Sequence, residues 1–488
     1  MRNQNMFSAK KLMLLLLAGT ISLAGCKKYL DVNDNPNNPD SATPALLLPT
    51  VEASVGQLIG NSFQVNGGIW AQFWTQSPTA SQYRTLDQYN PTNTTYDRPW
   101  LTIYRSALIN AELIINNPVN SPYAKGMAYV LKAYTFQVAT DAFGDIPLGE
   151  ALKGNEYTSP KYATQELVYD SVFTYIDKGI ALLNTATAPA IGAQDMIFQG
   201  NTTKWKAFAN TLKLKAYLRL SQVNASKAQA GIAAIYAANP AFLTEDASIK
   251  YTTTGGNQNP LYNEMVALNR TQNLVASGTT VKAFKANNDP RAFKFYNFVS
   301  GGSTDTIAYI NQGTYASNST KRVSTPSVLV GGVAVDDASA VAPVKLMSTS
   351  ESAFLQAEAV ARGWASGSVT ALFTSGVTSS FTSVGLTAAQ ATAYLAAAPA
   401  AQLTTTPADQ IKTIITQKYF SMCGFQGFEA WTEWRRTGYP DFLVRSAASV
   451  LGANTRVALR MLYPNSEITT NANYPGTQLI YTPVWWDK

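Results

Sequence analysis

The sequence contains no histidine, the side chain that most often moves protons in enzymes near neutral pH. Catalytic arrangements built on histidine, such as Ser-His-Asp and Cys-His, are therefore excluded. The chain has only two cysteines, Cys26 and Cys423, so zinc sites made of cysteine and histidine are excluded as well. Charged residues make up 14% of the chain and form no basic run, which argues against nucleic-acid binding.

The N-terminus has the pattern of a secretory signal. Arg2, Lys10 and Lys11 precede the apolar residues 12–17, a run too short to span a bilayer. Small residues at 24 and 25 stand directly before Cys26, an arrangement that resembles a bacterial lipobox. We therefore predict a signal peptide over residues 1–25, and the resemblance implies lipid attachment at Cys26. The alternative is ordinary cleavage, with Cys26 incidental.

Residues 26–44 are rich in Asn, Asp and Pro, and this composition predicts an extended tether behind the lipid anchor. Asp31, Asn33 and Asn35 alternate like the first ligands of a calcium-binding loop. Pro36 stands where such a loop needs glycine, and no glutamate follows at the twelfth position, so turns explain these residues better. We predict no metal and no cofactor.

In the first half of the chain, apolar residues recur at three- and four-residue steps, which predicts amphipathic helices. The expected helices cover 98–117, 122 to the loop at 143–147, 166–183 and 205–216. Each helix needs a neighbour to cover its apolar stripe. We predict a mostly α-helical fold whose helix pairs resemble a worn tetratricopeptide array and form a superhelical scaffold.

Residues 240–345 lose this helical period and are rich in Gly, Thr, Ser and Asn. We predict short strands and loops there, with residues 327–335 as one strand-like segment. Helices return at 350–364 and from about 407 to 420, and another carries Glu429 and Glu433. One domain over 45–488 follows, with a helical scaffold of about 45–239 and 346–488 and a loop-rich insert of about 240–345.

Five segments together resemble the SusD/RagB family of outer-membrane lipoproteins, and within it the SusD-like branch described as nutrient-binding. They occur in the family's order and are spread over almost the whole chain that follows the signal peptide. The segments are DVNDNPNNP at 31–39, DAFGDIPL at 141–148, WKAFANTLKLKAYLRLS at 205–221, SESAFLQAEAVARG at 350–363 and QKYFSMCGFQGFEAWTEWRRTGYP at 417–440.

The resemblance implies a lipoprotein that is anchored in the outer membrane and exposed at the cell surface. Such a protein captures an oligosaccharide and delivers it to a SusC-like TonB-dependent β-barrel transporter, without being an enzyme. Lys27, which follows the lipid-bearing cysteine, does not contradict outer-membrane sorting. Two alternatives stay open: capture of a peptide, and a helical scaffold that binds a protein partner and no small ligand.

Residues 69–100 hold the densest supply of unassigned aromatic and polar side chains. Sugar-binding proteins stack aromatic faces on pyranose rings and hold hydroxyl groups with amides, carboxylates and arginine. In this helix-poor loop we expect exposed rings, although Trp70 and Trp74 suit either one helical face or the core. Segments 251–262 and 296–315 of the insert also carry tyrosines that could wall a site. The candidate ligand contacts are Trp70, Trp74, Tyr83, Arg84, Asp87, Tyr89, Asn90 and Trp100.

Glu429 and Glu433 form the one carboxylate pair whose spacing suits a glycosidase. However, the two project from the same face of one helix, whereas catalytic carboxyl groups flank the substrate from opposite sides. Arg435 and Arg436 would also keep them ionised, which is wrong for a general acid. We therefore predict no catalytic residue.

The same helix suits a structural role. Trp431 and Trp434 are three residues apart, a spacing that packs one helical face onto a neighbour, and Gly438 and Pro440 end the helix. We expect a C-terminal clasp with ion pairs between the glutamates and arginines of this stretch, and with Trp434 as a buried ring.

Overall fold

The computed structural model describes residues 44–299, 306–453 and 455–487. The predictions for the signal peptide, for Cys26 and for the tether lie outside these ranges. Residues 44–488 group into one compact unit. Helices dominate it, which confirms the predicted mostly α-helical class, and its described strands form three antiparallel pairs.

Helices in the first half of the chain begin at side-chain caps. Ser121, Thr164 and Asn201 each accept a hydrogen bond from a backbone N–H of the first turn that follows. The helices predicted over 98–117, from 122 to the loop at 143–147, over 166–183 and over 205–216 are found to within a few residues, whereas α2, α3, α4, η2 and α10 were not predicted. The helical segments are α2 (Pro44–Gly60), α3 (Ser62–Trp70), α4 (Arg84–Asp87), η2 (Asn93–Tyr96), α5 (Asp97–Leu101), η3 (Thr102–Leu108), α6 (Ile109–Asn116), α7 (Pro122–Phe143), α8 (Gln165–Leu183), α9 (Thr202–Arg219) and α10 (Ala225–Ala237).

The run predicted as one helix over 98–117 changes its winding in the middle. Its central segment, η3, is a π-helix, with α5 before it and α6 after it. This segment packs along α2. π-Turns are rare and occur frequently at functional sites.

The insert is more helical than predicted. It contains α11 (Pro260–Ala267), α12 (Gly278–Ala286), α13 (Ala292–Phe295) and α14 (Asp337–Ala340). The predicted strand at 327–335 is wrong, since the 3-10 turn η8 (Val328–Val330) lies there. Helices this short complete too few turns for a period to show in the sequence.

Short antiparallel pairs tie distant parts of the chain together. β4 (Ala247–Ile249) pairs with β6 (Val344–Met347), so the two ends of the insert lie side by side. β1 (Trp74–Gln76) pairs with β5 (Leu274–Ala276) and joins the predicted aromatic loop to the insert. β2 (Ile146–Pro147) pairs with β3 (Tyr162–Ala163).

The last third of the chain returns to helices, as predicted. The helix that carries Glu429 and Glu433 ends at Gly438, whose φ of 73° is left-handed and suits glycine. Residues 366–408 are rich in Ala, Thr and Ser, and the two helices in this stretch, α16 and α17, were not predicted. The helices are α15 (Thr349–Ala361), α16 (Val369–Thr382), α17 (Ala388–Ala397), α18 (Pro407–Met422), α19 (Gly427–Thr437) and α20 (Asn465–Thr470).

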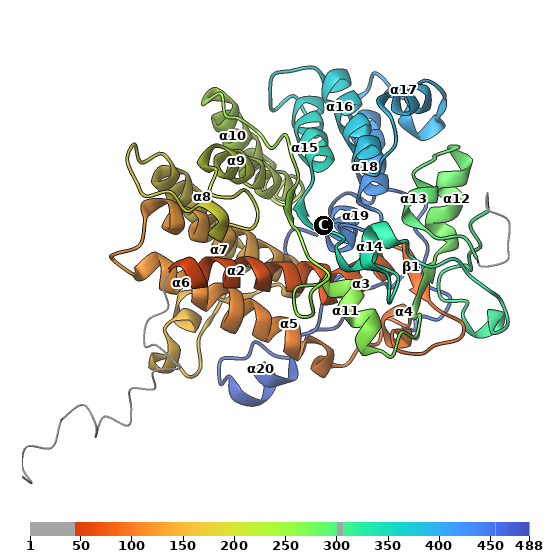
Figure 1. The fold of residues 1–488 in the computed structure, drawn as a ribbon, viewed down its shortest axis with the longest axis horizontal. Coiled ribbons are helices and arrows are strands. Elements are labelled where there is room, and N and C mark those ends of the chain that lie inside the picture. The colour runs from red at the N-terminus through yellow and green to blue at the C-terminus, as the bar shows by residue number, and fades with distance from the viewer. Residues whose placement is uncertain (1–43, 300–305, 454, 488) are drawn as a thin grey trace, which may run out of the picture. The chain divides into compact units, whose positions relative to one another are not determined.

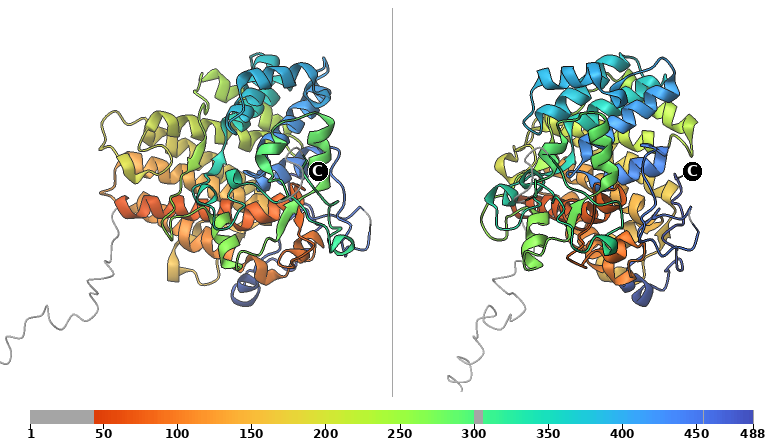
Figure 2. Two further views of the ribbon diagram at one scale, coloured as in Figure 1. Left: turned by 45° about the vertical axis from the view of Figure 1, so that its right-hand side comes forward. Right: turned by 90° about the vertical axis from the view of Figure 1, so that its right-hand side faces the viewer.

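Early and late helices meet in the middle of this unit. Figure 1 shows α7 to α10 on the left and α15 to α18 at the top, and the turned views of Figure 2 keep the cyan and lighter blue helices of this group above the red α2. α3 and α19 touch backbone to backbone, because a Cβ atom on Gly67 would lie 2.2 Å from the backbone nitrogen of Phe428. The close approach places the glutamates of α19 inside the protein.

Candidate functional site

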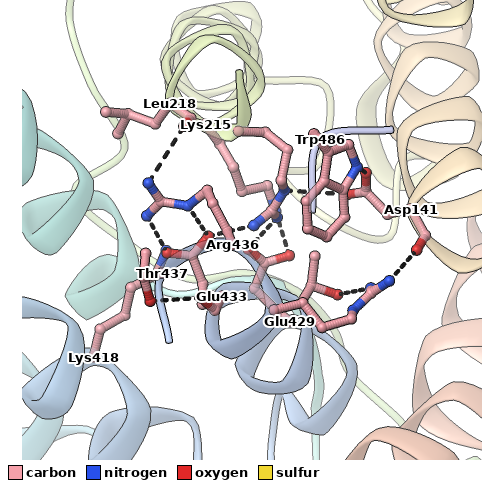
Figure 3. A network of polar contacts seen from close by, with 12 residues as sticks. Asp141, Lys215, Leu218, Lys418, Glu429, Glu433, Arg436, Thr437 and Trp486 are labelled. Carbon is pink, nitrogen blue, oxygen red and sulfur yellow. Dashed lines mark hydrogen bonds and ion pairs between the residues drawn. The ribbon is translucent and has the colours of Figure 1, made fainter. Parts of the chain in front are cut away.

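The glutamate pair singled out by its spacing is buried. Glu429 and Glu433 are 8% and 4% exposed. Both are labelled in Figure 3. Arg219 of α9 lies between them, with Nη2 2.6 Å from Oε1 of Glu429 and Nη1 donating to Oε1 of Glu433. A substrate cannot reach carboxylates that are enclosed and already paired in this way.

Other charged side chains extend this pairing to neighbouring helices. Arg436 donates to Glu358 of α15 and to Glu433 at 2.7 and 2.6 Å. The ammonium group of Lys418 in α18 lies 3.2 Å from Glu433. We refer to this set as the central charge network; it comprises Asp141, Lys215, Arg219, Glu351, Glu358, Lys418, Glu429, Glu433 and Arg436.

The network keeps its glutamates ionised. Burial alone raises the pKa of Glu433, but Arg436, Lys418 and Arg219 outweigh it and hold that pKa well below the usual range. The pKa of Glu429 is lowered in the same way, with burial opposed chiefly by Arg219. A general acid needs the opposite direction, so the pair is suited to holding helices together.

Two details of the predicted clasp are corrected. Trp431 is the fully buried ring, while Trp434 is only partly buried. Arg435 pairs with neither glutamate; its guanidinium stacks 3.6 Å from the Trp431 ring centroid and donates to the backbone oxygens of Asp141 and Leu459.

The rings of the predicted aromatic loop also point inward. The expectation of exposed rings is wrong for Tyr83, Tyr89 and Trp100, which are 5 to 8% exposed. Trp70 ends α3 and Trp74 lies in β1, so the two do not share a helical face, and both are buried.

Their partners explain this burial. The Trp70 ring packs 4.7 Å from that of Trp431, and the indole N–H of Trp100 donates to Glu467 at 3.1 Å. These contacts join residues that lie more than 300 positions apart in the sequence. Whether any of these rings touches a ligand stays a prediction.

Asp87 is fully buried and acts as a hub for the loops around it. It accepts hydrogen bonds from Thr75 Oγ1 and the Gln76 N–H, both at 2.7 Å, and from Gln312 Nε2 at 2.6 Å. The backbone oxygen of Gln312 in turn accepts from the N–H of Ala447. Burial raises the pKa of Asp87 to about 6, although these donors oppose the rise.

Arg84 and Asn90 are the predicted contacts that remain exposed. The guanidinium of Arg84 lies 5.4 Å from the ring centroid of Tyr315 in the insert. Gln88 donates to the Tyr315 hydroxyl at 3.2 Å. The predicted loop and the insert therefore meet at the surface, as the tyrosines of the insert suggested.

Next to this meeting point lies a cavity of about 970 Å³ between α12, α18 and the loop after α19, which we call the α12–α18 cavity. Pockets that bind small molecules commonly have volumes of about 300 to 1,000 Å³. Gln312, which donates to Asp87, and Ala447, which donates to Gln312, both line it. Other lining residues include Lys282, Ala283, Ala286, Asn287, Asn311, Thr314, Ala400, Gln402, Asp409, Lys412, Asp441, Phe442, Val444 and Arg445.

The cavity mixes an apolar wall with polar groups. Phe442 is half-buried and stacks on Phe420 of α18, with ring centroids 6.0 Å apart. Lys282 donates to Asn311 Oδ1 at 2.9 Å, and Lys412 lies 2.5 Å from Asp441. One aromatic ring with amides and solvated charges around it can hold a polar molecule by stacking and hydrogen bonds.

Sequence reasoning missed this cavity. Its walls come from the insert, the start of α18 and residues 441–447, which are far apart in the chain. No local pattern marks such a site, and none of the tyrosines of segment 296–315 lines it.

Within the described ranges, no cluster of three or more His, Cys, Asp and Glu side chains is placed to hold a metal ion. Among the helices described, none combines the length and apolar character that a membrane span requires.

Comparisons with known proteins extend over most of the chain. A family model described as SusD-like, starch-binding and associating with the outer membrane matches residues 36–464. A SusD homolog from Bacteroides uniformis is 25% identical, with a TM-score of 0.74 and 91% of this chain and 99% of that chain covered. A chitin-binding SusD homolog from Flavobacterium johnsoniae is 22% identical, with a TM-score of 0.74 and coverage of 91% and 97%. No curated protein matches.

A SusD homolog from Bacteroides fragilis has a TM-score of 0.76 at 22% identity, with 92% of this chain and all of that chain covered. Likenesses at this identity establish the fold, which is the tetratricopeptide-like helical fold of SusD homologues. Family membership is shown by the family model, which matches both the scaffold and the insert. The chain is a member of the SusD-like family.

Proposed function

We propose that the protein is a lipid-anchored, surface-exposed outer-membrane protein that captures an oligosaccharide and delivers it to a SusC-like TonB-dependent transporter. The α12–α18 cavity is the observation that carries the binding step. Its volume, its one aromatic wall and its amide groups suit a sugar chain. The family description and the chitin-binding relative support the same ligand class.

Within this proposal, Lys282, Asn311 and Arg445 hold the ligand's oxygens, and Phe442 offers a stacking surface. Arg84 and Asn90 add contacts at the nearby surface of the predicted loop. The other predicted residues act indirectly: their side chains are buried and hold that loop in place. Ion-paired carboxylates such as Glu433 take no part in ligand binding, and the protein performs no catalysis.

Calorimetry with maltoheptaose and with chitohexaose tests the binding step. Lys282→Ala should weaken binding about 5-fold or more, since a hydrogen bond from a charged donor is lost. Lys206→Ala is the matched control, because Lys206 also donates to an asparagine, Asn184, at 3.0 Å and lies outside the cavity. Binding that is equally strong in both variants would remove the cavity from the proposal.

A broader panel decides between ligand classes. Heat only on injection of peptides would favour the peptide alternative. No heat with any glycan or peptide, together with a β-barrel that co-purifies after mild detergent extraction, would favour the scaffold alternative. Loss of radiolabelled palmitate and of membrane association in Cys26→Ser would support the anchor, and retention of both would contradict it.

A further inference from the structure

A second polar cavity lies between α2 and the π-helix η3, with a volume of about 620 Å³. We call it the α2–η3 groove. It shares no lining residue with the α12–α18 cavity. Its lining consists of Thr50, Ala53, Ser54, Gln57, Thr102, Ser106, Met196, Ile249, Lys250, Tyr251, Thr252, Gly256, Asn257, Gln258, Pro260 and Asn263.

The lining is almost free of charge. Lys250 is its one ionisable side chain apart from the tyrosine, and it includes no carboxylate. Amides and hydroxyls dominate, and these groups both donate and accept hydrogen bonds, as sugar hydroxyls do. Met196 and Pro260 add apolar surface for the C–H face of a sugar ring. An anionic polymer would find a single cation here, so the lining favours a neutral ligand.

Polar side chains of the groove lack hydrogen-bond partners among the described residues. The hydroxyl of Tyr251 is buried and makes no hydrogen bond within the described chain. It lies against α2, where a Cβ atom on Gly56 would be 2.7 Å away. The side-chain amide of Gln57, one residue further along α2, likewise makes no hydrogen bond to the described residues and is partly exposed. Unpaired buried groups are rare because they are costly, so an orphan hydroxyl in a cavity indicates a missing partner.

The third observation is the helix that forms the opposite wall. Thr102 and Ser106 enter the groove from η3, the π-helical segment. A π-turn widens the helix and costs regular hydrogen bonding, and such turns occur frequently at functional sites. The groove and the irregular segment therefore coincide.

We propose that the α2–η3 groove is a second binding site, which takes a neutral oligosaccharide. Tyr251 and Gln57 supply its hydrogen bonds on the α2 side, and Thr102 and Ser106 supply them on the other. The proposed function provides only the general ligand class; the neutrality and the position follow from the groove itself.

The test uses full-length protein in detergent, with maltoheptaose and chitohexaose as probes. Hydrogen–deuterium exchange should show protection of residues 50–57 and 249–258 when either probe is bound, apart from any protection at the α12–α18 cavity. Tyr251→Phe removes only the orphan hydroxyl and should weaken binding at the groove about 3- to 10-fold. Tyr236→Phe is the matched control, since its hydroxyl is also buried and unpartnered in the described chain but lies outside the groove.

The possible outcomes distinguish binding at the α2–η3 groove from binding at the α12–α18 cavity. Protection at the groove that needs a higher probe concentration in Tyr251→Phe, but not in Tyr236→Phe, supports the second site even if the α12–α18 cavity stays unprotected. Protection confined to the α12–α18 cavity, or equal groove affinity in both variants, overturns the second site and leaves the proposed function standing. An unchanged exchange pattern throughout the chain overturns both.

Discussion

The central charge network and the α12–α18 cavity use the same residue types in opposite ways. In the network, the side chains of Arg219 and Glu433 are at most 5% exposed, and every glutamate faces a cation. At the cavity, Lys412 and Asp441 are 44% and 59% exposed, although they also form an ion pair. A buried charge that loses its partner is costly, whereas a solvated charge is not. The network therefore fixes the fold, and the cavity charges are free to exchange water for a ligand.

Removing one carboxylate of the central charge network should have the largest effect on the free energy of unfolding. Glu433→Ala leaves Arg219, Lys418 and Arg436 short of a buried counter-ion and should lower the free energy of unfolding by about 3 to 5 kcal/mol. Asp441→Ala at the cavity should change it by no more than about 0.5 kcal/mol. Urea denaturation followed by circular dichroism measures both. Similar losses in the two variants would show that burial does not separate the regions.

The two tryptophans of α19 differ in burial in the same way, within one helix. Trp431 is fully buried, so Trp431→Ala should cost about 3 to 5 kcal/mol of stability. Trp434 is partly exposed, and Trp434→Ala should cost only about 1 kcal/mol. Thermal unfolding of the two variants side by side measures the difference, and the reverse order would contradict the observed packing.

Asp87 is intermediate between the network and the cavity charges. It is buried like the network, but no cation among the described residues pairs with it. Its pKa is raised by burial from 3.8 to about 6, so the folded protein keeps this proton at a pH where the unfolded chain has lost it. Stability from this group is present below about pH 4 and is lost as the pH rises to about 6. The stability advantage of the wild type over Asp87→Asn should therefore fall by roughly 3 kcal/mol across that window and stay level above it.

Urea denaturation of both proteins at several pH values between 4 and 7 gives this difference directly. The glutamates of the network titrate in both proteins, so their effect cancels. An advantage that grows with pH would mean that the donors on Asp87 outweigh its burial.

The smallest effect is expected at the exposed edge of the predicted loop. Arg84→Ala should leave the free energy of unfolding within about 0.5 kcal/mol of the wild type, because Arg84 is exposed. Glycan affinity should fall about 2- to 5-fold if this loop touches the ligand, as a single exposed hydrogen bond would give. Calorimetry measures the affinity, and an unchanged value would confine binding to the cavity walls.

Much of the scaffold could be predicted because its helices are long. Helices α7, α8 and α9 run for 22, 19 and 18 residues, enough for their apolar period and their caps to show in the sequence. The short helices of the insert gave no such period, and α12 spans only 9 residues.

Burial in the candidate site could not be predicted, because its partners are distant in sequence. Loop composition suggested that Trp100 was available to a ligand, whereas its indole N–H donates to Glu467. It left Trp70 open between a ligand contact and the core, and the Trp70 ring packs against Trp431. The same distance hides the cavity, where Lys282, Asn311 and Arg445 meet only in the folded chain. The glutamate pair shows the converse: cations keep it ionised, as predicted. Arg436 of the same helix is the principal cation for Glu433, but for Glu429 it is Arg219 in α9.

The pairing of β4 with β6 has a consequence for how such a protein can diversify. It closes the insert at its base, so the chain leaves the scaffold and returns to it at adjacent points. The closure cost of a loop rises only slowly with its length, and here the ends are already held together. Exposed residues between the two strands can therefore change in number and kind, whereas Phe284 and Arg291, which pack against α18, are tied to the scaffold. A new ligand preference can thus arise in the insert without a new fold.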